Sequence, residues 1–382
     1  MSINNIQDQK VIKKFKTLNE LNISKSVPIF DNNYLKIGKK IGEGGFGSVF
    51  ESIYYSTQVA LKTIKLDSEE DINTDFLKEL SILKHINHKN IPSLYGVILP
   101  NKVILEKING VNLQKIVKLI NIDLSDTSTI YNNKSNIENM SSFSNQKIDL
   151  FNSETFNLLE LFKIKSMLDF CDVLLFVHNN NIIHRDLKPN NLMINKNLKC
   201  ILLDFGISKL ADKTKTTYNP RHGTIIYFSP EHVQVGDNET IRISKKTDVW
   251  AFGLILNEVF SGEIPWSAYN IVSNMQVLGL LYENKKFIVS KLIKNSDIIR
   301  IIKECTKYDK QLRYSTEQVY IHLLIAFFKC LKTINLRNFI NVIIEYFDFK
   351  RKLPLFGKNK EKSDNKDINY LYKSSKILII QY

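Results

Sequence analysis

The feature that most constrains this chain is a glycine-rich stretch followed by a strand. Residues 42–49 read Gly-Glu-Gly-Gly-Phe-Gly-Ser-Val, and a short apolar run at 58–64 carries Lys62. Glycine lets backbone amides approach phosphate oxygens that a Cβ atom would block. A dinucleotide-binding fold needs a helix after such glycines and an acidic residue ~20 positions later, but here a strand with a lysine takes that place. The pattern predicts a β-hairpin over a phosphate group, and a plain hairpin turn is the alternative.

A compact polar cluster lies between two apolar segments further along the chain. Residues 184–191 read His-Arg-Asp-Leu-Lys-Pro-Asn-Asn, with Ile-Ile before them and Leu-Met after them. The carboxylate of Asp186 can accept a hydroxyl proton, Lys188 can steady a phosphoryl group, and the amide oxygen of Asn191 can ligate Mg²⁺. An ordinary polar turn is disfavoured by three such side chains in so apolar a frame.

A third segment, Asp204-Phe205-Gly206, follows the apolar residues 200–203. An aspartate that ends a buried strand is often only a cap. At this distance from the polar cluster, Asp204 could instead supply a second contact to a metal ion.

Together these segments resemble the eukaryotic protein kinase family over about residues 34–328. The resemblance implies an α+β fold with two lobes. The N-lobe, 34–108, would hold a small antiparallel sheet and one helix, and the C-lobe, 109–328, would be larger and mainly helical. It also implies that the protein transfers the γ-phosphoryl group of ATP, bound with Mg²⁺, to serine or threonine hydroxyls of protein substrates.

The resemblance assigns roles to individual residues. Asp186 would act as the base, Lys188 would stabilise the transferred phosphoryl group, and Asn191 and Asp204 would bind Mg²⁺. Lys62 would hold the phosphates and pair with Glu79. The residues implied to bind or position ATP are Ile41, Gly42, Glu43, Gly44, Gly45, Phe46, Gly47, Ser48, Val49, Ala60, Lys62, Glu79, Glu106, Ile108 and Met193.

Later motifs fit the same family. Residues 223–231 resemble the end of an activation segment, in which Thr224 would bridge Asp186 and Lys188 and leave a shallow site suited to serine and threonine. Glu231 would be buried with Arg313, because a buried charge without a partner is costly. Asp248, in Asp-Val-Trp-Ala-Phe-Gly, would brace the catalytic loop. The Asp204–Lys209 and Glu263–Trp266 segments are similar to the tyrosine-kinase-like branch.

The family also implies a mode of regulation. Arg185 precedes the catalytic aspartate and would pair with a phosphate on the activation segment, added by an upstream kinase. Candidate sites are Thr214, Thr216, Thr217 and Tyr218. A loop that is never modified is the alternative. Two alternatives to the serine/threonine activity stay open: dual specificity, and a pseudokinase scaffold without turnover.

Composition and net charge limit the classes of partner that we expect this chain to bind. The net charge is +14, which invites a nucleic-acid or anionic-membrane partner, yet no nucleic-acid-reading motif accompanies the lysines. We therefore expect no specific nucleic-acid binding, and a weak contact of the basic tail with anionic surfaces. Apolar runs fall short of the ~20 residues of a transmembrane helix. Four dispersed cysteines predict reduced, buried thiols and a cytoplasmic location, with the nucleus open.

The domain organisation follows from shifts in pattern along the sequence. Residues 1–33 are polar and predict an extension with little independent structure. Residues 121–157 are crowded with Asn, Ser and Asp without periodicity, which predicts an insertion in the C-lobe. Residues 329–382 form a basic tail that includes the lysine-rich run 350–366.

Overall fold

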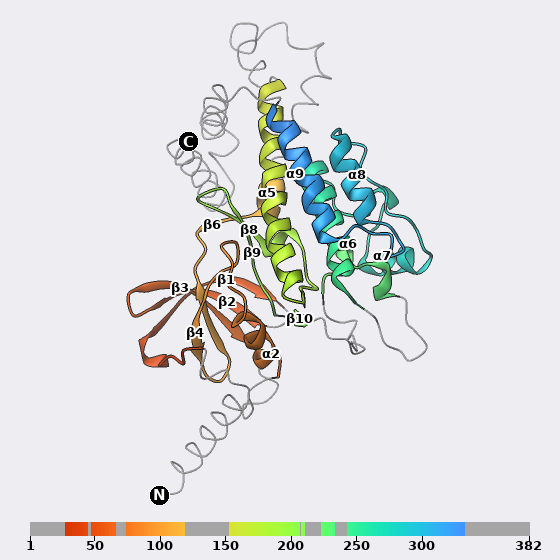
Figure 1. The fold of residues 1–382 in the computed structure, drawn as a ribbon. Helices are drawn as coiled ribbons and strands as arrows, with labels where there is room; N and C mark the ends of the chain where they lie inside the picture. Colours follow the sequence, from red (N-terminus) through yellow and green to blue (C-terminus); the bar gives the residue numbers. More distant parts are fainter. Residues whose placement is uncertain are drawn as a thin grey trace, which may run out of the picture.

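The computed structural model describes residues 27–44, 47–65, 74–118, 153–206, 208–210, 223–233 and 243–332. Within these ranges the chain forms two lobes, one built around a sheet and one around helices (Figure 1). This arrangement confirms the expected two-lobed α+β fold.

The N-lobe is an antiparallel sheet of five strands with one helix. The strands lie in the order β1-β2-β3-β5-β4, and α2 packs beside them (Figure 1). Leu61 of β3 and Ile104 of β5 are fully buried and belong to one apolar cluster of the sheet. The strands are β1 Leu35–Gly44, β2 Gly47–Tyr54, β3 Thr57–Ile64, β4 Leu94–Ile98 and β5 Lys102–Glu106, and the helix is α2 Thr74–Leu83.

Part of the expected N-terminal extension belongs to the N-lobe. Val27 is buried at 3% exposure, and the amide of Phe30 donates to the carbonyl of Val97 at 2.7 Å. The amide of Val97 donates in turn to the carbonyl of Pro28 at 2.9 Å. Residues 28–30 therefore lie along the edge of the sheet beside β4. The sequence did not predict this pairing, because a short, isolated bridge has no periodicity.

The C-lobe is built from long helices, of which α6 is the most deeply buried. α5 and α9 lie side by side, and α6 runs through the centre with nearly every residue buried (Figure 1). Trp250 and Trp266 pack in this core with ring centroids 6.3 Å apart. The helices are α5 Ser153–Asn179, α6 Lys245–Ser261, α7 Asn274–Tyr282, α8 Ser296–Cys305 and α9 Thr316–Lys332.

Short strands and turns of the C-lobe carry the functional loops. A three-stranded sheet has the order β6-β8-β9, and β7 pairs with β10. The strands are β6 Gly110–Asn112, β7 Ile182–Ile183, β8 Leu192–Asn195, β9 Cys200–Leu202 and β10 Lys209–Leu210. Short 3-10 turns cover Pro189–Asn191, Ile225–Tyr227 and Pro230–His232.

Two helical boundaries differ from the sequence-based expectation. α5 begins at Ser153, inside the segment expected to be an insertion, and α9 continues to Lys332, four residues past the expected end of the C-lobe. α7 was missed, because the sequence offers it only nine residues. The remainder of the insertion and the basic tail lie outside the described residues. None of the described helices is long and apolar enough to cross a membrane.

All four cysteines are buried and unpaired, as expected. Burial raises the pKa of the thiols of Cys171, Cys200 and Cys305, and raises that of Cys330 to about 11.

A buried ion pair fastens the 223–233 segment to the C-lobe. Arg313 donates to both carboxylate oxygens of Glu231, at 2.7 and 2.8 Å, and stacks over Trp250. Its remaining N–H groups reach the backbone carbonyls of Lys307, Lys246 and Tyr308. All five guanidinium donors are thus satisfied, which a buried arginine needs. The pairing confirms the expectation for Glu231 and Arg313.

We expect Arg313→Met to lower the free energy of unfolding by about 3–5 kcal/mol, because it leaves the Glu231 carboxylate buried without a cation. Urea unfolding followed by circular dichroism measures this. Arg300→Met is the matched control, since Arg300 is exposed and its contacts with Asp297 and His322 lie at the surface, and we expect it to cost less than about 1 kcal/mol. Equal losses in both variants would contradict the assignment.

The Glu231–Arg313 pair also makes the stability of the folded protein depend on pH. Burial alone would raise the pKa of Glu231, but the Arg313 guanidinium more than offsets this and lowers it. The folded protein therefore binds the proton more weakly than the unfolded chain, so the pair stabilises fully above the unfolded pKa of ~4.3. The stability difference between wild type and Arg313→Met should shrink as the pH falls through the lowered pKa.

Candidate active site

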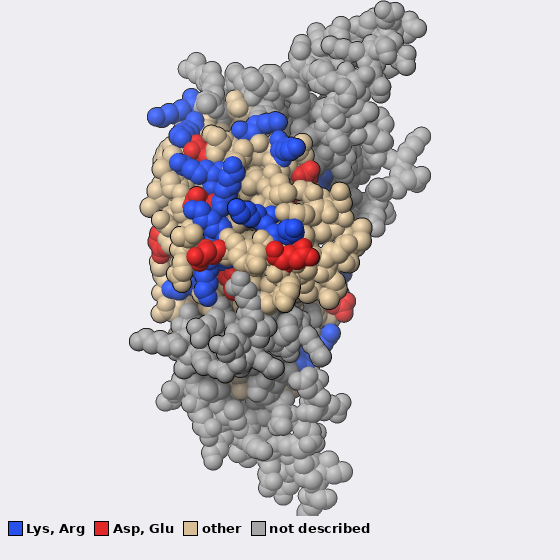
Figure 2. Space-filling view, turned by 90° about the vertical axis from the view of Figure 1, so that its right-hand side faces the viewer, with Lys and Arg blue, Asp and Glu red and all other residues tan. Residues whose placement is uncertain are grey.

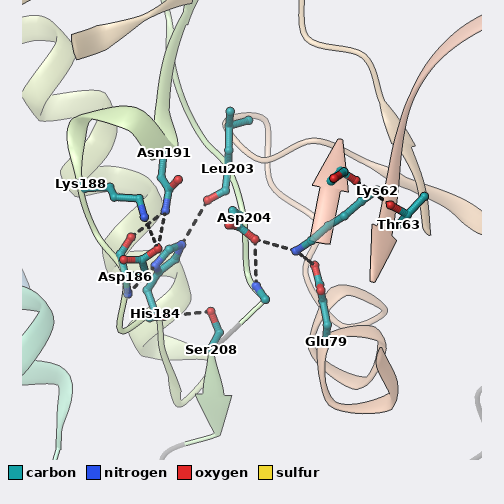
Figure 3. Close-up of polar contacts among 12 residues, drawn as sticks. Lys62, Thr63, Glu79, His184, Asp186, Lys188, Asn191, Leu203, Asp204 and Ser208 are labelled. Carbon is teal, nitrogen blue, oxygen red and sulfur yellow. Dashed lines mark hydrogen bonds and ion pairs between the residues drawn. The ribbon is translucent and has the colours of Figure 1, made fainter. Parts of the chain in front are cut away.

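Three charged residues from separate elements meet at the boundary between the lobes. Lys62 of β3 donates to Oε1 of Glu79 on α2 and to Oδ1 of Asp204, both at 2.6 Å (Figure 3). Lys62 and Glu79 are buried, whereas the side chain of Asp204 is 43% exposed. The sequence predicted the Lys62–Glu79 pair, and the structure confirms it. The ammonium group of Lys62 that pairs with Glu79 also binds Asp204.

Burial and the neighbouring charges shift the pKa values of Lys62 and Asp204 in opposite directions. Burial would lower the pKa of Lys62, but the carboxylates of Glu79 and Asp204 raise it above its ordinary range. Burial would raise the pKa of Asp204, yet the Lys62 ammonium holds it below its ordinary value. Lys62 therefore stays protonated, and Asp204 stays ionised at neutral pH.

The catalytic loop is fixed through its backbone by one buried carboxylate. Asp248 of α6 accepts from the amide of His184 at 2.8 Å and from the amide of Arg185 at 2.9 Å. It also contacts Nε2 of His178 at 2.9 Å, and Nδ1 of His178 lies 2.6 Å from the hydroxyl of Thr316. The expected brace by Asp248 is confirmed, and it extends to α5 and α9.

The predicted base lies in a network of three side chains. Lys188 donates to Oδ2 of Asp186 at 2.6 Å and to the hydroxyl of Thr224 at 3.0 Å, and that hydroxyl donates to Oδ1 of Asp186 at 2.9 Å. Thr224 therefore bridges Asp186 and Lys188, as the sequence predicted. Asn191 donates from Nδ2 to the carbonyl of Asp186 at 2.7 Å (Figure 3). This contact orients the amide and leaves its oxygen as an acceptor.

The glycine-rich segment forms the predicted hairpin. In β1 and β2, Gly42 pairs with Val49, Glu43 with Ser48, and Gly44 with Gly47. A Cβ atom at Gly47 would lie 1.8 Å from the carbonyl oxygen of Thr63, so only glycine fits there. The predicted residues Gly45 and Phe46 lie outside the described residues.

The expected adenine-contacting residues come from both lobes. Ile41 of β1 is 52% exposed, and Ala60 of β3 pairs with Leu105 of β5. Met193 lies on β8 of the C-lobe, and Ile108 follows β5 in the connection between the lobes. These residues stay predictions as nucleotide contacts.

Two predicted residues turn their side chains elsewhere. The carboxylate of Glu106 accepts from the amide and the hydroxyl of Ser93, and that of Glu43 pairs with Lys40 at 2.8 Å. Both side chains are therefore engaged within the N-lobe, and the two residues stay predictions as nucleotide contacts.

The residues present fit a nucleotide and a divalent cation. A Cβ atom built on Gly44 would meet nothing within 4 Å, so open space lies beside the hairpin at this residue. Asp204 offers a partly exposed carboxylate, and Asn191 offers an amide oxygen, which are the hard oxygen ligands that Mg²⁺ prefers.

Sequence reasoning missed two contributors. His178 reaches Asp248 from a long apolar helix, and a single histidine in that helix was the available signal. Gly206 lies against the charged triad, because a Cβ atom there would be 2.9 Å from Nζ of Lys62 and 3.1 Å from Oδ1 of Asp204. The four candidate phosphorylation sites, residues 214–218, lie outside the described residues.

Comparison with known proteins agrees with this geometry. The family model of protein tyrosine and serine/threonine kinases matches residues 35–323. A probable serine/threonine-protein kinase of Dictyostelium discoideum is 31% identical over 245 residues, which cover 62% of this chain and 22% of that protein. A LysM domain receptor-like kinase of Medicago truncatula is 29% identical over 237 residues, covering 60% and 32%.

A serine/threonine-protein kinase of Arabidopsis thaliana is 26% identical over 238 residues, covering 61% of this chain and 34% of that protein. This chain thus spans about a fifth to a third of the length of these relatives. The matched segment contains the glycine-rich hairpin, the charged triad and the catalytic loop. The chain belongs to the protein tyrosine and serine/threonine kinase family.

Proposed function

We propose that this protein is an active serine/threonine kinase that uses ATP and Mg²⁺. The observation that carries the proposal is the joined triad of Lys62, Glu79 and Asp204, with both contacts at 2.6 Å. A lysine held between a glutamate of one lobe and an aspartate of the other is positioned to bind phosphate oxygens beside a carboxylate that can ligate Mg²⁺. The pseudokinase alternative predicts nucleotide or partner binding without turnover.

Each side chain has a distinct part in the proposed reaction. Bound Mg-ATP supplies the phosphoryl group and the cation charge that offsets its oxygens. Lys62 holds the phosphates, and Glu79 fixes the position of the ammonium. Asp186 accepts the proton of the substrate hydroxyl through a carboxylate that Lys188 and Thr224 hold in place. Lys188 then lies where negative charge develops on the transferred group.

The contact between Thr224 and Asp186 supports the choice of serine and threonine. The hydroxyl of Thr224 occupies one oxygen of the base and keeps the acceptor site shallow, which suits a short hydroxyl side chain. Dual specificity is the alternative, and phosphoamino-acid analysis distinguishes the two. Regulation by an upstream kinase, the protein substrates and a cytoplasmic location stay predictions.

Replacing the base tests the activity. We expect Asp186→Asn to lower transfer of ³²P from γ-labelled ATP to a generic protein substrate by about 10²–10⁴-fold, because the amide cannot accept the proton. Asp172→Asn is the matched control, since Asp172 lies on α5 and pairs with Lys89 away from the site. Undiminished transfer by Asp186→Asn would reveal a contaminating kinase and favour the pseudokinase reading.

Substitutions of Thr224 test whether its hydroxyl supports the reaction. Thr224→Val removes one hydrogen bond to the base and one to Lys188, and we expect kcat/KM to fall by about 10–100-fold. Thr224→Ser keeps the hydroxyl and should stay within a few-fold of wild type. If the serine variant were as slow as the valine variant, the hydroxyl would not be the cause.

A substitution of Gly206 tests whether the close spacing around the Lys62 ammonium matters for the reaction. Gly206→Ala places a methyl group 2.9 Å from the ammonium of Lys62 and so displaces it from Asp204. We expect kcat/KM to fall by about 10–100-fold, because the ammonium that would hold the phosphates is moved out of its position beside Asp204. Gly279→Ala on α7 is the control, since its Cβ atom meets nothing within 4 Å. An unaffected rate in Gly206→Ala would contradict the tight spacing.

A further inference from the structure

One face of the C-lobe carries an excess of positive charge. Residues 285–310 contain eight lysines and arginines against three aspartates and glutamates, a surplus of five charges within 26 residues. Figure 2 shows Lys and Arg side chains gathered over this side of the C-lobe, where they outnumber Asp and Glu. This surplus is a large share of the net charge of +14.

The charge is organised by α8. Ile298, Ile301 and Ile302 are fully buried on one side of the helix, and Arg300 and Lys303 are exposed on the other. Lysines continue the row in the segments before and after α8. At 1.5 Å per residue, the helix alone extends the row over about 15 Å.

Most of these cations are not neutralised. Asp297 already receives both Arg300 and Lys329, and Glu304 pairs with Lys307. Five lysines have no carboxylate partner within the part of the chain that the structure describes: Lys286, Lys291, Lys294, Lys303 and Lys310. A group of unpaired lysines repels itself, and an anionic partner would relieve that repulsion.

Exposed leucines lie in the same segments. Leu292 is 58% exposed between Lys291 and Lys294, and Leu312 is 63% exposed two residues after Lys310. Each exposes apolar surface to water near lysines that have no carboxylate partner among the described residues. We name these five lysines and two leucines the α8 face.

We propose that the α8 face binds an anionic lipid bilayer. A bilayer surface meets both properties at once, because its headgroups attract the lysines and its acyl boundary accepts the leucines. A nucleic acid, or an acidic peptide without apolar side chains, would satisfy the lysines but would leave the leucines without an apolar partner. α8 lies at the outer side of the C-lobe, away from the sheet of the N-lobe (Figure 1), so a bound bilayer leaves the proposed active site accessible.

Vesicle flotation of the full chain tests the proposal. We expect binding to phosphatidylcholine vesicles that contain 30% phosphatidylserine, at about 0.1 M salt, and little binding to phosphatidylcholine alone. The variant Lys291→Glu/Lys294→Glu/Lys303→Glu/Lys310→Glu should bind about tenfold or more weakly, since each basic residue contributes about 1 kcal/mol near such a surface.

The matched control carries the same charge change elsewhere. Lys36→Glu/Lys39→Glu/Lys196→Glu/Lys199→Glu alters exposed lysines of β1 and the β8–β9 turn, and should keep most of the binding. Equal losses in both fourfold variants would show that net charge alone drives binding, and would overturn the proposal. So would a loss confined to Lys350→Glu/Arg351→Glu/Lys352→Glu, because the tail would then be the contact.

The leucines separate a bilayer from other polyanions. Leu292→Ser/Leu312→Ser should weaken vesicle binding several-fold but leave binding to polyglutamate or RNA unchanged. If vesicle binding did not change, or if polyglutamate or RNA bound as tightly as the vesicles, the partner would be another polyanion. Kinase activity and thermal midpoint of each variant report folding. They also separate this proposal from the proposed function, because vesicle binding needs no catalysis.

Discussion

The buried carboxylate of Asp248 is the constraint on which the site depends. The catalytic loop carries an arginine, a lysine and an aspartate, and Arg185 has a positive φ of 74° that a non-glycine residue rarely adopts. Within this loop the side chains of His184 and Leu187 are buried. Asp248 holds the loop, because its carboxylate accepts hydrogen bonds from two consecutive backbone amides. Nε2 of His178 contacts Oδ2 of the same carboxylate. The other side chains of the loop are thereby left free for chemistry.

Both lobes supply charged side chains to the triad of Lys62, Glu79 and Asp204. The N-lobe supplies a lysine and a glutamate on rigid elements, and the C-lobe supplies Asp204 at the end of a short buried segment. Because the lysine is shared, the distance between the lobes at this point is set by two contacts of 2.6 Å. Burial makes these contacts strong, since an ammonium removed from water depends on its carboxylate partners. The same logic, with arginine and glutamate, fixes the 223–233 segment at the other side of the catalytic loop.

Much of this could be predicted from the sequence, and the exceptions have physical causes. The long helices follow from their apolar spacing, whereas the antiparallel sheet of the N-lobe and the pairs Lys62–Glu79 and Glu231–Arg313 were implied by the resemblance to protein kinases. α7 and the pairing of residues 28–30 with Val97 were missed, because short elements are decided by tertiary contacts rather than by local pattern. Gly206 was seen as part of a motif, but its closeness to Lys62 depends on a contact between lobes that no sequence pattern encodes. The link from His178 to Thr316 joins residues 138 positions apart and was invisible for the same reason.

The burial of every cysteine has a practical consequence for studying this molecule. The chain contains only four cysteines, all are shielded, and their thiols are held in the protonated, unreactive form. A single cysteine introduced on an exposed strand or helix would therefore react with a maleimide dye or a spin label ahead of the native thiols. Paired labels on the two lobes could then report the opening and closing of the cleft by fluorescence transfer or electron resonance, without first removing any native residue.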